Sequence, residues 1–244
     1  MTQKVTPYQD SNASKKEQIE QMFDTISGNY DGLNRVISLG IDQKWRKKVV
    51  KLVKSEAPKN VLDIATGTGD LAIQFAAQIP DAKITGLDIS QGMLDVAIKK
   101  TAHLSYKDRL QFMQADSEQM PFDDNSFDVI TVSFGIRNFE TLEKGLAEIY
   151  RVLAPGGLFV VLETSVPTKF PYKQGYAVYS KVVLPVVGKL FSKDKVAYKY
   201  LSKSAASFPH GARLNNIFKN IGFIAIENNP QTFGVATIYS ARKK

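Results

Sequence analysis

The sequence predicts an α/β fold, in which a mostly parallel sheet is covered by helices on both faces. Three observations predict it. Short apolar runs alternate with segments of helical periodicity from Asn60 onward. The first of these runs ends in an acid and a glycine turn. The last two runs have no helix between them, so they should pair antiparallel. Because repeated strand–helix units produce parallel sheets, we expect one domain over residues 1–244.

The N-terminal part, residues 14–57, is predicted to be helical. Residues 14–17 (SKKE) form a capping box, and the apolar side chains that follow recur at helical spacing. A polar, aromatic turn is expected at 29–34, and Asp42 can cap a helix that carries Trp45. We expect these helices to lie as a lid over a ligand crevice. Packing against the sheet edge is the alternative, which we favour for Trp45.

Strands and helices alternate through the rest of the chain. Strands are predicted at 60–65, 83–88, 109–113, 127–133 and 157–163. Helices are predicted at 70–79, 91–102 and 141–153, and Ser90 can cap the second of these. A later helix, closed by Gly222, precedes two final strands near 223–228 and 234–240. The expected sheet therefore has seven strands.

Composition argues against several functional classes. The chain has no Cys and two His, which argues against thiolate chemistry and a metal cluster, so no metal site is expected. No apolar run reaches roughly 18 residues, the length that a membrane-spanning helix needs. The N-terminus is polar and lacks the apolar core of a signal peptide, so a cytoplasmic location is expected. The net charge is +8, and eight Lys against one acid fall between residues 168 and 205.

The most informative stretch is 60–70, NVLDIATGTGD, where a strand ends in an acid and turns through glycines into a helix. The residues of this motif are Asp63, Gly67, Thr68 and Gly69. Glycines let the backbone approach a ligand, and the helix start offers free N–H groups. Asp88 ends the second strand, where a carboxylate suits the two hydroxyls of a ribose. The pattern fits a dinucleotide, the shorter loop of S-adenosylmethionine (SAM) methyltransferases, or a turn without a ligand.

Two further features favour SAM. Asp116 follows the third strand, where its carboxylate can accept a hydrogen bond from an adenine amino group. Residues 151–157, RVLAPGG, end a helix and turn into the fifth strand, and this turn resembles class I SAM-dependent methyltransferases. A dehydrogenase would need a second glycine cluster or a substrate domain, and neither is visible. The expected architecture is therefore the Rossmann-like, mostly parallel, seven-stranded sheet of that class.

Longer motifs resemble the quinone-biosynthesis C-methyltransferases, the family that makes menaquinone and ubiquinone. YDGLN at 30–34, FGIRN at 134–138 and the segment 151–165 match its signatures, and the likeness runs from about Asp24 to the C-terminus. The chain departs from the usual signatures at three positions, Leu33, Asp42 and Ala154, where the family usually has Met, His and Lys. None of these departures removes a group that the predicted chemistry needs.

The resemblance implies a set of SAM contacts. They are Thr68 in the SAM loop, Asp88 on the ribose, Asp116 and Ser117 beside the adenine, and Ser133 at the end of the fourth strand. From chemistry alone, Asp63 is added, acting through water on the methionine ammonium group. Gly67 and Gly69 complete the loop that approaches the ligand.

The resemblance also implies methyl transfer to a ring carbon of an isoprenoid quinol. We favour demethylmenaquinol, with a ubiquinone-pathway benzoquinol or another soluble phenol as the alternative. The reaction draws electron density from a ring oxygen, and a phenol of pKa about 10 needs help to lose its proton. The candidates are Arg137 and Asn138 after the fourth strand, with Tyr30 from the lid. Arg137 should stabilise the phenolate, or else form a structural salt bridge; His210 is the second choice of base.

The basic segment, residues 168–207, is predicted to be a helical insertion. Its apolar stripe is Tyr172, Tyr176, Tyr179, Val183, Val186 and Leu190, and its lysine stripe is Lys195, Lys199 and Lys203. Together they suit peripheral contact with anionic lipid at the inner face of the cell membrane, where an isoprenoid quinol resides. A packed insertion is the alternative. No RNA-binding module is visible, so no nucleic-acid partner is expected. A homodimer is compatible with the sequence, which leaves the oligomeric state open.

Overall fold

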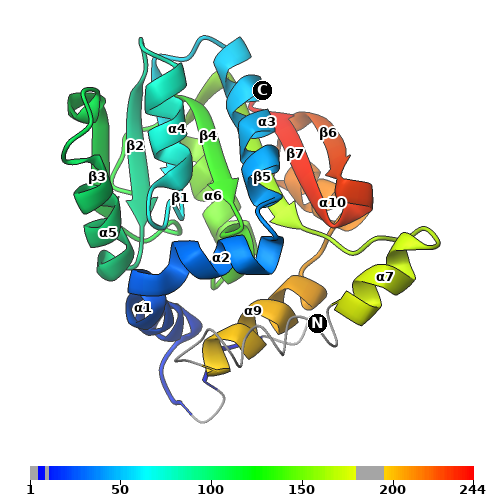
Figure 1. Ribbon diagram of the computed structural model, residues 1–244. Helices are drawn as coiled ribbons and strands as arrows, with labels where there is room; N and C mark the ends of the chain where they lie inside the picture. Colours follow the sequence, from blue (N-terminus) through cyan, green and yellow to red (C-terminus); the bar gives the residue numbers. More distant parts are fainter. Residues whose placement is uncertain (1–4, 9–10, 180–194) are drawn as a thin grey trace.

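The computed structural model describes residues 5–8, 11–179 and 195–244. Its described part is built around a seven-stranded sheet in the order β3-β2-β1-β4-β5-β7-β6 (Figure 1). The strands are β1 (Asn60–Ile64), β2 (Lys83–Asp88), β3 (Leu110–Gln114), β4 (Phe127–Ser133), β5 (Leu153–Thr164), β6 (Ile224–Gln231) and β7 (Ala236–Arg242). The predicted strands are confirmed, and β5 begins earlier than expected because Leu153 already pairs with Phe127 before a register shift.

The helices precede, separate and follow the strands. They are α1 (Lys15–Ile26), α2 (Tyr30–Ser38), α3 (Asp42–Ser55), α4 (Asp70–Gln78), α5 (Gln91–Thr101), α6 (Leu142–Val152), α7 (Tyr172–Val178), α9 (Lys195–Ser207) and α10 (Ala212–Ile221). Short 3-10 turns include η1 (Ser27–Asn29), η3 (Ile136–Asn138) and η5 (Thr232–Gly234). Ser90 caps α5 as predicted, since its hydroxyl accepts from the Met93 N–H.

The sheet is mixed in the way the sequence predicts. Strands β1 to β5 pair in parallel, whereas β7 pairs antiparallel with both β5 and β6. The chain moves outward in one direction from β1 to β3 and then crosses back to β4 on the other side of β1. This reversal opens a crevice at the carboxyl ends of β1 and β4, which is where open parallel sheets bind ligands.

Helices cover both faces of the sheet, and side chains alternate between the two cores. Val61 of β1 packs with Trp45 of α3 and Phe75 of α4 on one face. Leu62, the next residue, packs with α6 and α10 on the other face. This alternation follows from the two-residue period of a strand and leaves the carboxyl edge as the accessible part of the sheet.

The N-terminal helices follow the prediction at their start and depart from it later. The capping box at Ser14 and Glu17 is present. The turn expected at 29–34 is wrong, because the chain turns earlier, in η1, and α2 begins at Tyr30. Asp42 is not a cap: it is the first residue of α3, and its carboxylate accepts instead from the Ser38 hydroxyl.

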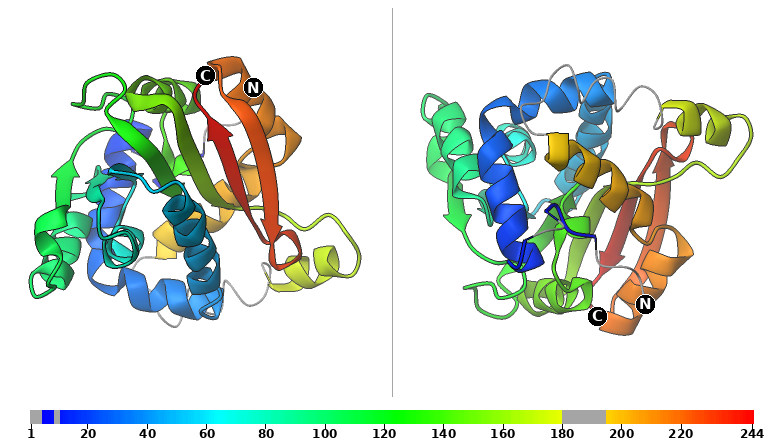
Figure 2. Two further views of the ribbon diagram at one scale, coloured as in Figure 1. Left: turned by 90° about the horizontal axis from the view of Figure 1, so that it is seen from above. Right: turned by 90° about the horizontal axis from the view of Figure 1, so that it is seen from below.

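The insertion contributes α7 and α9: α9 lies below the carboxyl edge of the sheet, and α7 lies beside the β6–β7 connection, where Tyr172 stacks on Phe233 (Figure 2). Val183, Val186 and Leu190 of the predicted apolar stripe lie outside the described residues, as do the side chains of Lys195 and Lys199. Across the described ranges, no helix is both long enough and apolar enough to cross a bilayer.

Candidate functional site

The loop after β1 approaches the crevice with its backbone. Ala65, Gly67 and Gly69 have positive φ angles of 52°, 59° and 78°, so three closely spaced residues adopt the left-handed conformation. Glycine takes that conformation without strain, and Ala65 shows that strain is tolerated at this point. The Gly67 N–H donates to the carboxylate of Asp88 at 2.8 Å, which ties the loop to the end of β2.

Asp88 has little access to solvent and accepts two backbone hydrogen bonds. One comes from Gly67 and the other from the Ser90 N–H at 3.0 Å. Burial raises the pKa of this carboxyl, while the N–H donors oppose the shift because they stabilise the ionised form. The side chain borders a cavity at the carboxyl ends of the strands, so its position suits a hydroxyl-bearing ligand.

Asp63 lies at the end of β1 beneath the glycine loop. Its two oxygens accept from the hydroxyls of Thr66 at 2.7 Å and Thr131 at 2.6 Å. Burial raises the pKa of Asp63 to about 6, and the two hydroxyls and Arg46 oppose this shift. Asp63 therefore gains or loses its proton near pH 6, where most other carboxyl groups are already ionised.

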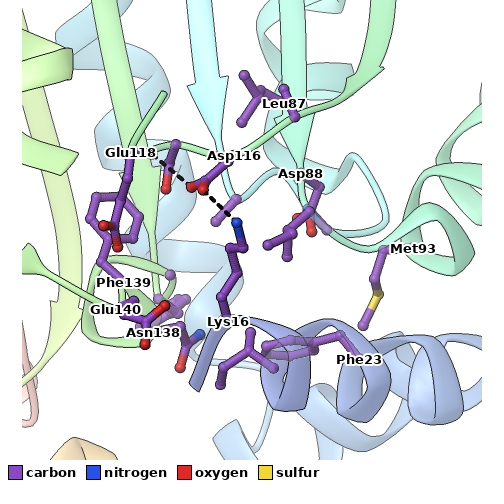
Figure 3. Close-up of a pocket in the computed structure, with 18 of the residues that line it drawn as sticks. Lys16, Phe23, Leu87, Asp88, Met93, Asp116, Glu118, Asn138, Phe139 and Glu140 are labelled. Carbon is purple, nitrogen blue, oxygen red and sulfur yellow. Dashed lines mark hydrogen bonds and ion pairs between the residues drawn. The ribbon is translucent and has the colours of Figure 1, made fainter. Parts of the chain in front are cut away.

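The first cavity, of about 70 Å³, is bounded by α1 and the ends of β1 to β4. Asp116 and Ser117 both border it, and Figure 3 shows Lys16 of α1 reaching across it to Asp116. The Lys16 ammonium lies 3.1 Å from the carboxylate of Asp116. The Lys16 side chain therefore occupies part of the space beside Asp116 that a bound ligand would share.

A second, smaller cavity adjoins the first on the other side of Gly67. Asp63, Thr68 and Ser133 border it, and Ser133 also borders the first cavity. The Thr68 hydroxyl donates to Asp31 of α2. The Ser133 hydroxyl is buried and has no hydrogen-bond partner within the described residues. A buried hydroxyl without a partner is costly, so a ligand group is expected beside it.

The third cavity is much larger, about 1150 Å³, and mainly apolar. It lies between α2, α7, α9 and η5, with Trp45 and Tyr176 among the residues around it. Tyr30 borders all three cavities. Burial raises the pKa of the Tyr30 hydroxyl, so at neutral pH it is a hydrogen-bond donor rather than a base.

Arg137 and Asn138 lie in η3, directly after β4. Arg137 borders the large cavity and forms the salt bridge expected as the alternative, with its Nη1 2.7 Å from Glu163. The pair is buried, and neither the Arg137 Nε nor the second Glu163 oxygen has a partner within the described residues. Asn138 borders the first cavity and accepts a hydrogen bond from the Tyr200 hydroxyl at 3.1 Å. His210 borders none of the three cavities.

Three polar residues at the site are not singled out as site residues by the sequence patterns. Lys16 is predicted only as part of a capping box. Glu163 follows an apolar run within a predicted strand, and this pattern could have indicated a buried acid. Arg46 follows Trp45 and falls four residues after Asp42, so helical spacing places its charge on the buried side of α3.

Comparison with known proteins adds an independent finding. Residues 11–243 match the ubiE/COQ5 methyltransferase family. A demethylmenaquinone methyltransferase of Bacteroides fragilis is 44% identical, with 99% of this chain and 98% of the relative covered. A ubiquinone/menaquinone biosynthesis C-methyltransferase of Geotalea daltonii is 45% identical over 94% of this chain and 97% of its own. A SAM-dependent methyltransferase of Thermotoga maritima shares the fold, with a TM-score of 0.64 at 18% identity, over 93% of this chain and all of that one.

The residues present fit SAM as the methyl donor. Carboxylates at the ends of β1 and β2, a glycine loop between them and the unpartnered Ser133 hydroxyl offer polar partners along one continuous edge. The family match, rather than this geometry, sets the dinucleotide alternative aside. The chain belongs to the ubiE/COQ5 methyltransferase family and is a SAM-dependent methyltransferase.

Proposed function

We propose that the enzyme methylates a ring carbon of demethylmenaquinol to give menaquinol. The observation that carries this proposal is the large apolar cavity, which meets the polar crevice at Tyr30. A cavity of about 1150 Å³ suits a fused aromatic ring together with the first part of an isoprenoid tail. Several relatives at 44% and 43% identity are named demethylmenaquinone methyltransferases, which supports the naphthoquinol, whereas others at 45% and 43% are named for both the ubiquinone and the menaquinone pathway.

SAM supplies the methyl group together with its own leaving group, so the chain need not provide a nucleophile. We assign the ribose hydroxyls to Asp88, the adenine to Asp116 and Ser117, and the ammonium group to Asp63. Gly67, Thr68 and Gly69 shape the loop against the donor. Lys16 and the adenine amino group are donors for the same Asp116 carboxylate, so we propose that the Lys16 contact competes with SAM for it.

The chain's own task is to stabilise charge on the acceptor ring. We assign this task to Arg137, whose guanidinium faces the large cavity while Glu163 and the Phe134 carbonyl hold its Nη1. Glu163 offsets part of the charge of Arg137, so the stabilisation that we assign rests on the Nε–H, which has no partner within the described residues and could donate to a phenolate with little screening by solvent. Tyr30, protonated at neutral pH, donates to the same region, and Asn138 orients the loop between the two cavities.

Two protons move while the methyl group is transferred. The ring hydroxyl loses its proton to water that Arg137 orients, and the ring carbon takes the methyl group. The proton on that carbon then leaves and the ring oxygen regains one, which restores the aromatic quinol. The products are menaquinol, S-adenosylhomocysteine and one proton. Arg137 stays protonated throughout, since a guanidinium is almost always charged.

The proposal is tested by incubating the purified enzyme with radiolabelled SAM and three reduced acceptors: a demethylmenaquinol, the corresponding benzoquinol and a soluble phenol without a tail. We expect label in the naphthoquinol, with a kcat/KM at least about tenfold above the others, because the smaller acceptors leave apolar surface of the cavity uncovered, at a cost of about 1–3 kcal/mol. Equal or greater transfer to the benzoquinol or the phenol would contradict the proposed substrate.

We further propose that the mouth of the large cavity rests on an anionic membrane. Leu39 and Phe233 border the cavity and are 83% and 66% exposed, and Phe170 and Val178, each next in sequence to a lining residue, are 80% and 61% exposed. Leu39 and Phe233 also hold positive φ angles of 51° and 58°, a strained conformation for bulky residues.

Charge supports the same surface. The described stretches 164–179 and 195–207 contain lysines and no acid. An apolar rim surrounded by lysines suits anionic lipid, and it would bring the cavity to the layer that holds isoprenoid tails. Sedimentation with vesicles containing anionic lipid should recover the wild-type protein. Phe233→Ser should bind less, whereas Ile98→Ser, at an exposed apolar position on α5, should bind normally. Binding that does not depend on anionic lipid would contradict the proposal.

A further inference from the structure

Arg46 occupies an unusual position at the small polar cavity. It belongs to α3, borders both the small polar and the large apolar cavity, and its side chain is only 11% exposed. Its Nε is buried and has no hydrogen-bond partner within the described residues. The nearest acid is Asp42, at 3.6 Å from that nitrogen, which is too long for a hydrogen bond.

The guanidinium is held in place by packing and by its ion pair with Asp42, although the Nε makes no hydrogen bond within the described residues. It lies over the ring of Phe134, with its central carbon 5.6 Å from the ring centre. A buried cation with an unmade hydrogen bond is costly, and a bound anion removes that cost. Arg46 is therefore positioned in advance for an acceptor that comes with a ligand.

The groups around Arg46 define what that ligand carries. The buried Ser133 hydroxyl, the other unpartnered group of this cavity among the described residues, can donate to an anion as well. Asp63 borders the same cavity and supplies a negative charge, which suits an ammonium group. Three further acids border the cavity, but Asp31 and Asp70 are paired with Lys100, and Asp42 lies beside Arg46. Asp63 and Arg46 then match the two charged ends of an α-amino acid, which is the methionine part of SAM.

Two other cations near this cavity are less suited to the role. Lys100 is already paired with Asp31 and Asp70. Arg35 borders the cavity from α2, but its side chain is exposed to solvent, where an ion pair contributes little.

We infer that Arg46, assisted by Ser133, binds the α-carboxylate of the methionine end of SAM. The inference deepens the proposed function and depends on it only in requiring SAM as the donor. Arg46 is then a binding residue of the donor site that holds the amino-acid end, while Asp88 and Asp116 hold the nucleoside end.

The test uses two nucleosides that differ only at this end. S-adenosylhomocysteine carries the carboxylate, whereas 5′-methylthioadenosine lacks the amino-acid part. Calorimetric titration of Arg46→Ala should show S-adenosylhomocysteine binding weakened roughly 10- to 100-fold, the range for removal of a charged hydrogen bond, with 5′-methylthioadenosine changed less than about twofold. Arg46→Lys should recover part of the affinity. Lys47→Ala, which removes an exposed charge from the next position of α3, is the matched control and should bind both normally.

The outcomes separate the inference from the proposed function. Equal weakening of both nucleosides, or full affinity in Arg46→Ala, overturns the inference alone. Selective loss in Arg35→Ala, with Arg46→Ala unaffected, assigns the carboxylate to the other arginine and also overturns it. A wild-type protein that binds neither nucleoside overturns the proposed function as well. If Arg46→Ala does not fold, Arg46→Lys and Ser133→Ala provide the same comparison of two affinities.

Discussion

The part of the site around the glycine loop, here called the donor side, is polar. The part around the large cavity, here called the acceptor side, is mainly apolar. Around the glycine loop, Asp63 and Asp88 are buried and engaged by short hydrogen bonds from hydroxyls and backbone N–H groups. Around the large cavity, apolar side chains from α2, α7 and η5 dominate, and several of them are open to solvent. In the proposed function, the donor side would therefore recognise its ligand by directed polar contacts, and the acceptor side by apolar volume.

This difference separates effects on affinity from effects on the reaction. Removing a polar group on the donor side should weaken binding of the nucleoside and leave the apolar cavity unchanged. Arg137 is the exception on the acceptor side, because it is a charged group in mainly apolar surroundings. Mutations at Arg137 should therefore give the largest loss of rate with the least loss of donor affinity.

The largest expected effect is that of Arg137→Met. Removing the cation beside the acceptor ring should lower kcat by about 10³-fold, comparable to the loss of a preorganised charge-stabilising donor. S-adenosylhomocysteine affinity should stay within about threefold of wild type, because Arg137 borders only the large cavity. Single-turnover methyl transfer and calorimetry measure the two quantities.

The buried partner of Arg137 requires its own control. Loss of the arginine leaves Glu163 unpaired, which destabilises the fold by about 3–5 kcal/mol. The double variant Arg137→Met, Glu163→Leu removes both charges and should recover stability in urea unfolding while activity stays low. Recovery of activity together with stability would show that the pair is only structural.

The second effect concerns Asp88→Ala, which removes the proposed ribose acceptor and frees the Gly67 N–H. S-adenosylhomocysteine should bind about 100-fold more weakly, because the ribose hydroxyls no longer donate to a charged group. Asp81→Ala, at an exposed acid just before β2, serves as the control and should bind normally. Affinity close to that of wild type in Asp88→Ala would remove this residue from the donor site.

The third effect is a pH dependence that arises from Asp63. Its pKa of about 6 in the free enzyme means that it is ionised at pH 7 and mostly protonated at about pH 5. An ammonium group binds the ionised form, so donor affinity should fall about tenfold between these values as the carboxyl is protonated. Calorimetry across pH measures this fall, and Asp63→Asn should bind weakly at both values. A wild-type affinity that does not change with pH would contradict the ammonium contact.

The fourth effect is a gain rather than a loss. In the proposed donor site, Lys16 competes with the adenine for Asp116, and the pair is half-exposed, so its loss costs at most about 1 kcal/mol. Lys16→Ala should therefore tighten S-adenosylhomocysteine binding by up to about fivefold. Lys44→Ala, another exposed lysine of the N-terminal helices, should leave affinity unchanged. Weaker binding in Lys16→Ala would indicate that Lys16 helps to hold the ligand.

The sequence predicts the donor side better than the acceptor side, for a physical reason. Glycine turns and acids at strand ends are local patterns, so Asp63, Gly67 and Asp88 could be located from their neighbours in the chain. The ion pair joins Arg137, just after β4, to Glu163 near the end of the neighbouring strand β5, and no local pattern selects between that pair and a free cation.

Other features that the sequence did not predict also depend on contacts between residues far apart in the chain. Tyr30 can start a helix because the chain has already turned in η1. Contacts between residues apart in the sequence, such as the packing of Tyr30 on Phe23, accompany this turn, and helix propensity alone does not reveal them. The large cavity is enclosed by helices that are far apart in the sequence, so its volume could not be predicted from any one of them.

The smallest expected effect concerns Leu39, at the rim of the large cavity. Leu39 is 83% exposed and ends α2 in a left-handed conformation. Glycine adopts that conformation without strain, so Leu39→Gly should raise the free energy of unfolding by about 1 kcal/mol, measured in urea. If Leu39 serves membrane contact, the same variant should bind anionic vesicles less, although it is more stable. Unchanged vesicle binding would show that the strained leucine does not serve membrane contact. Higher stability together with weaker vesicle binding would show that the fold retains the strained leucine for its lipid-facing surface.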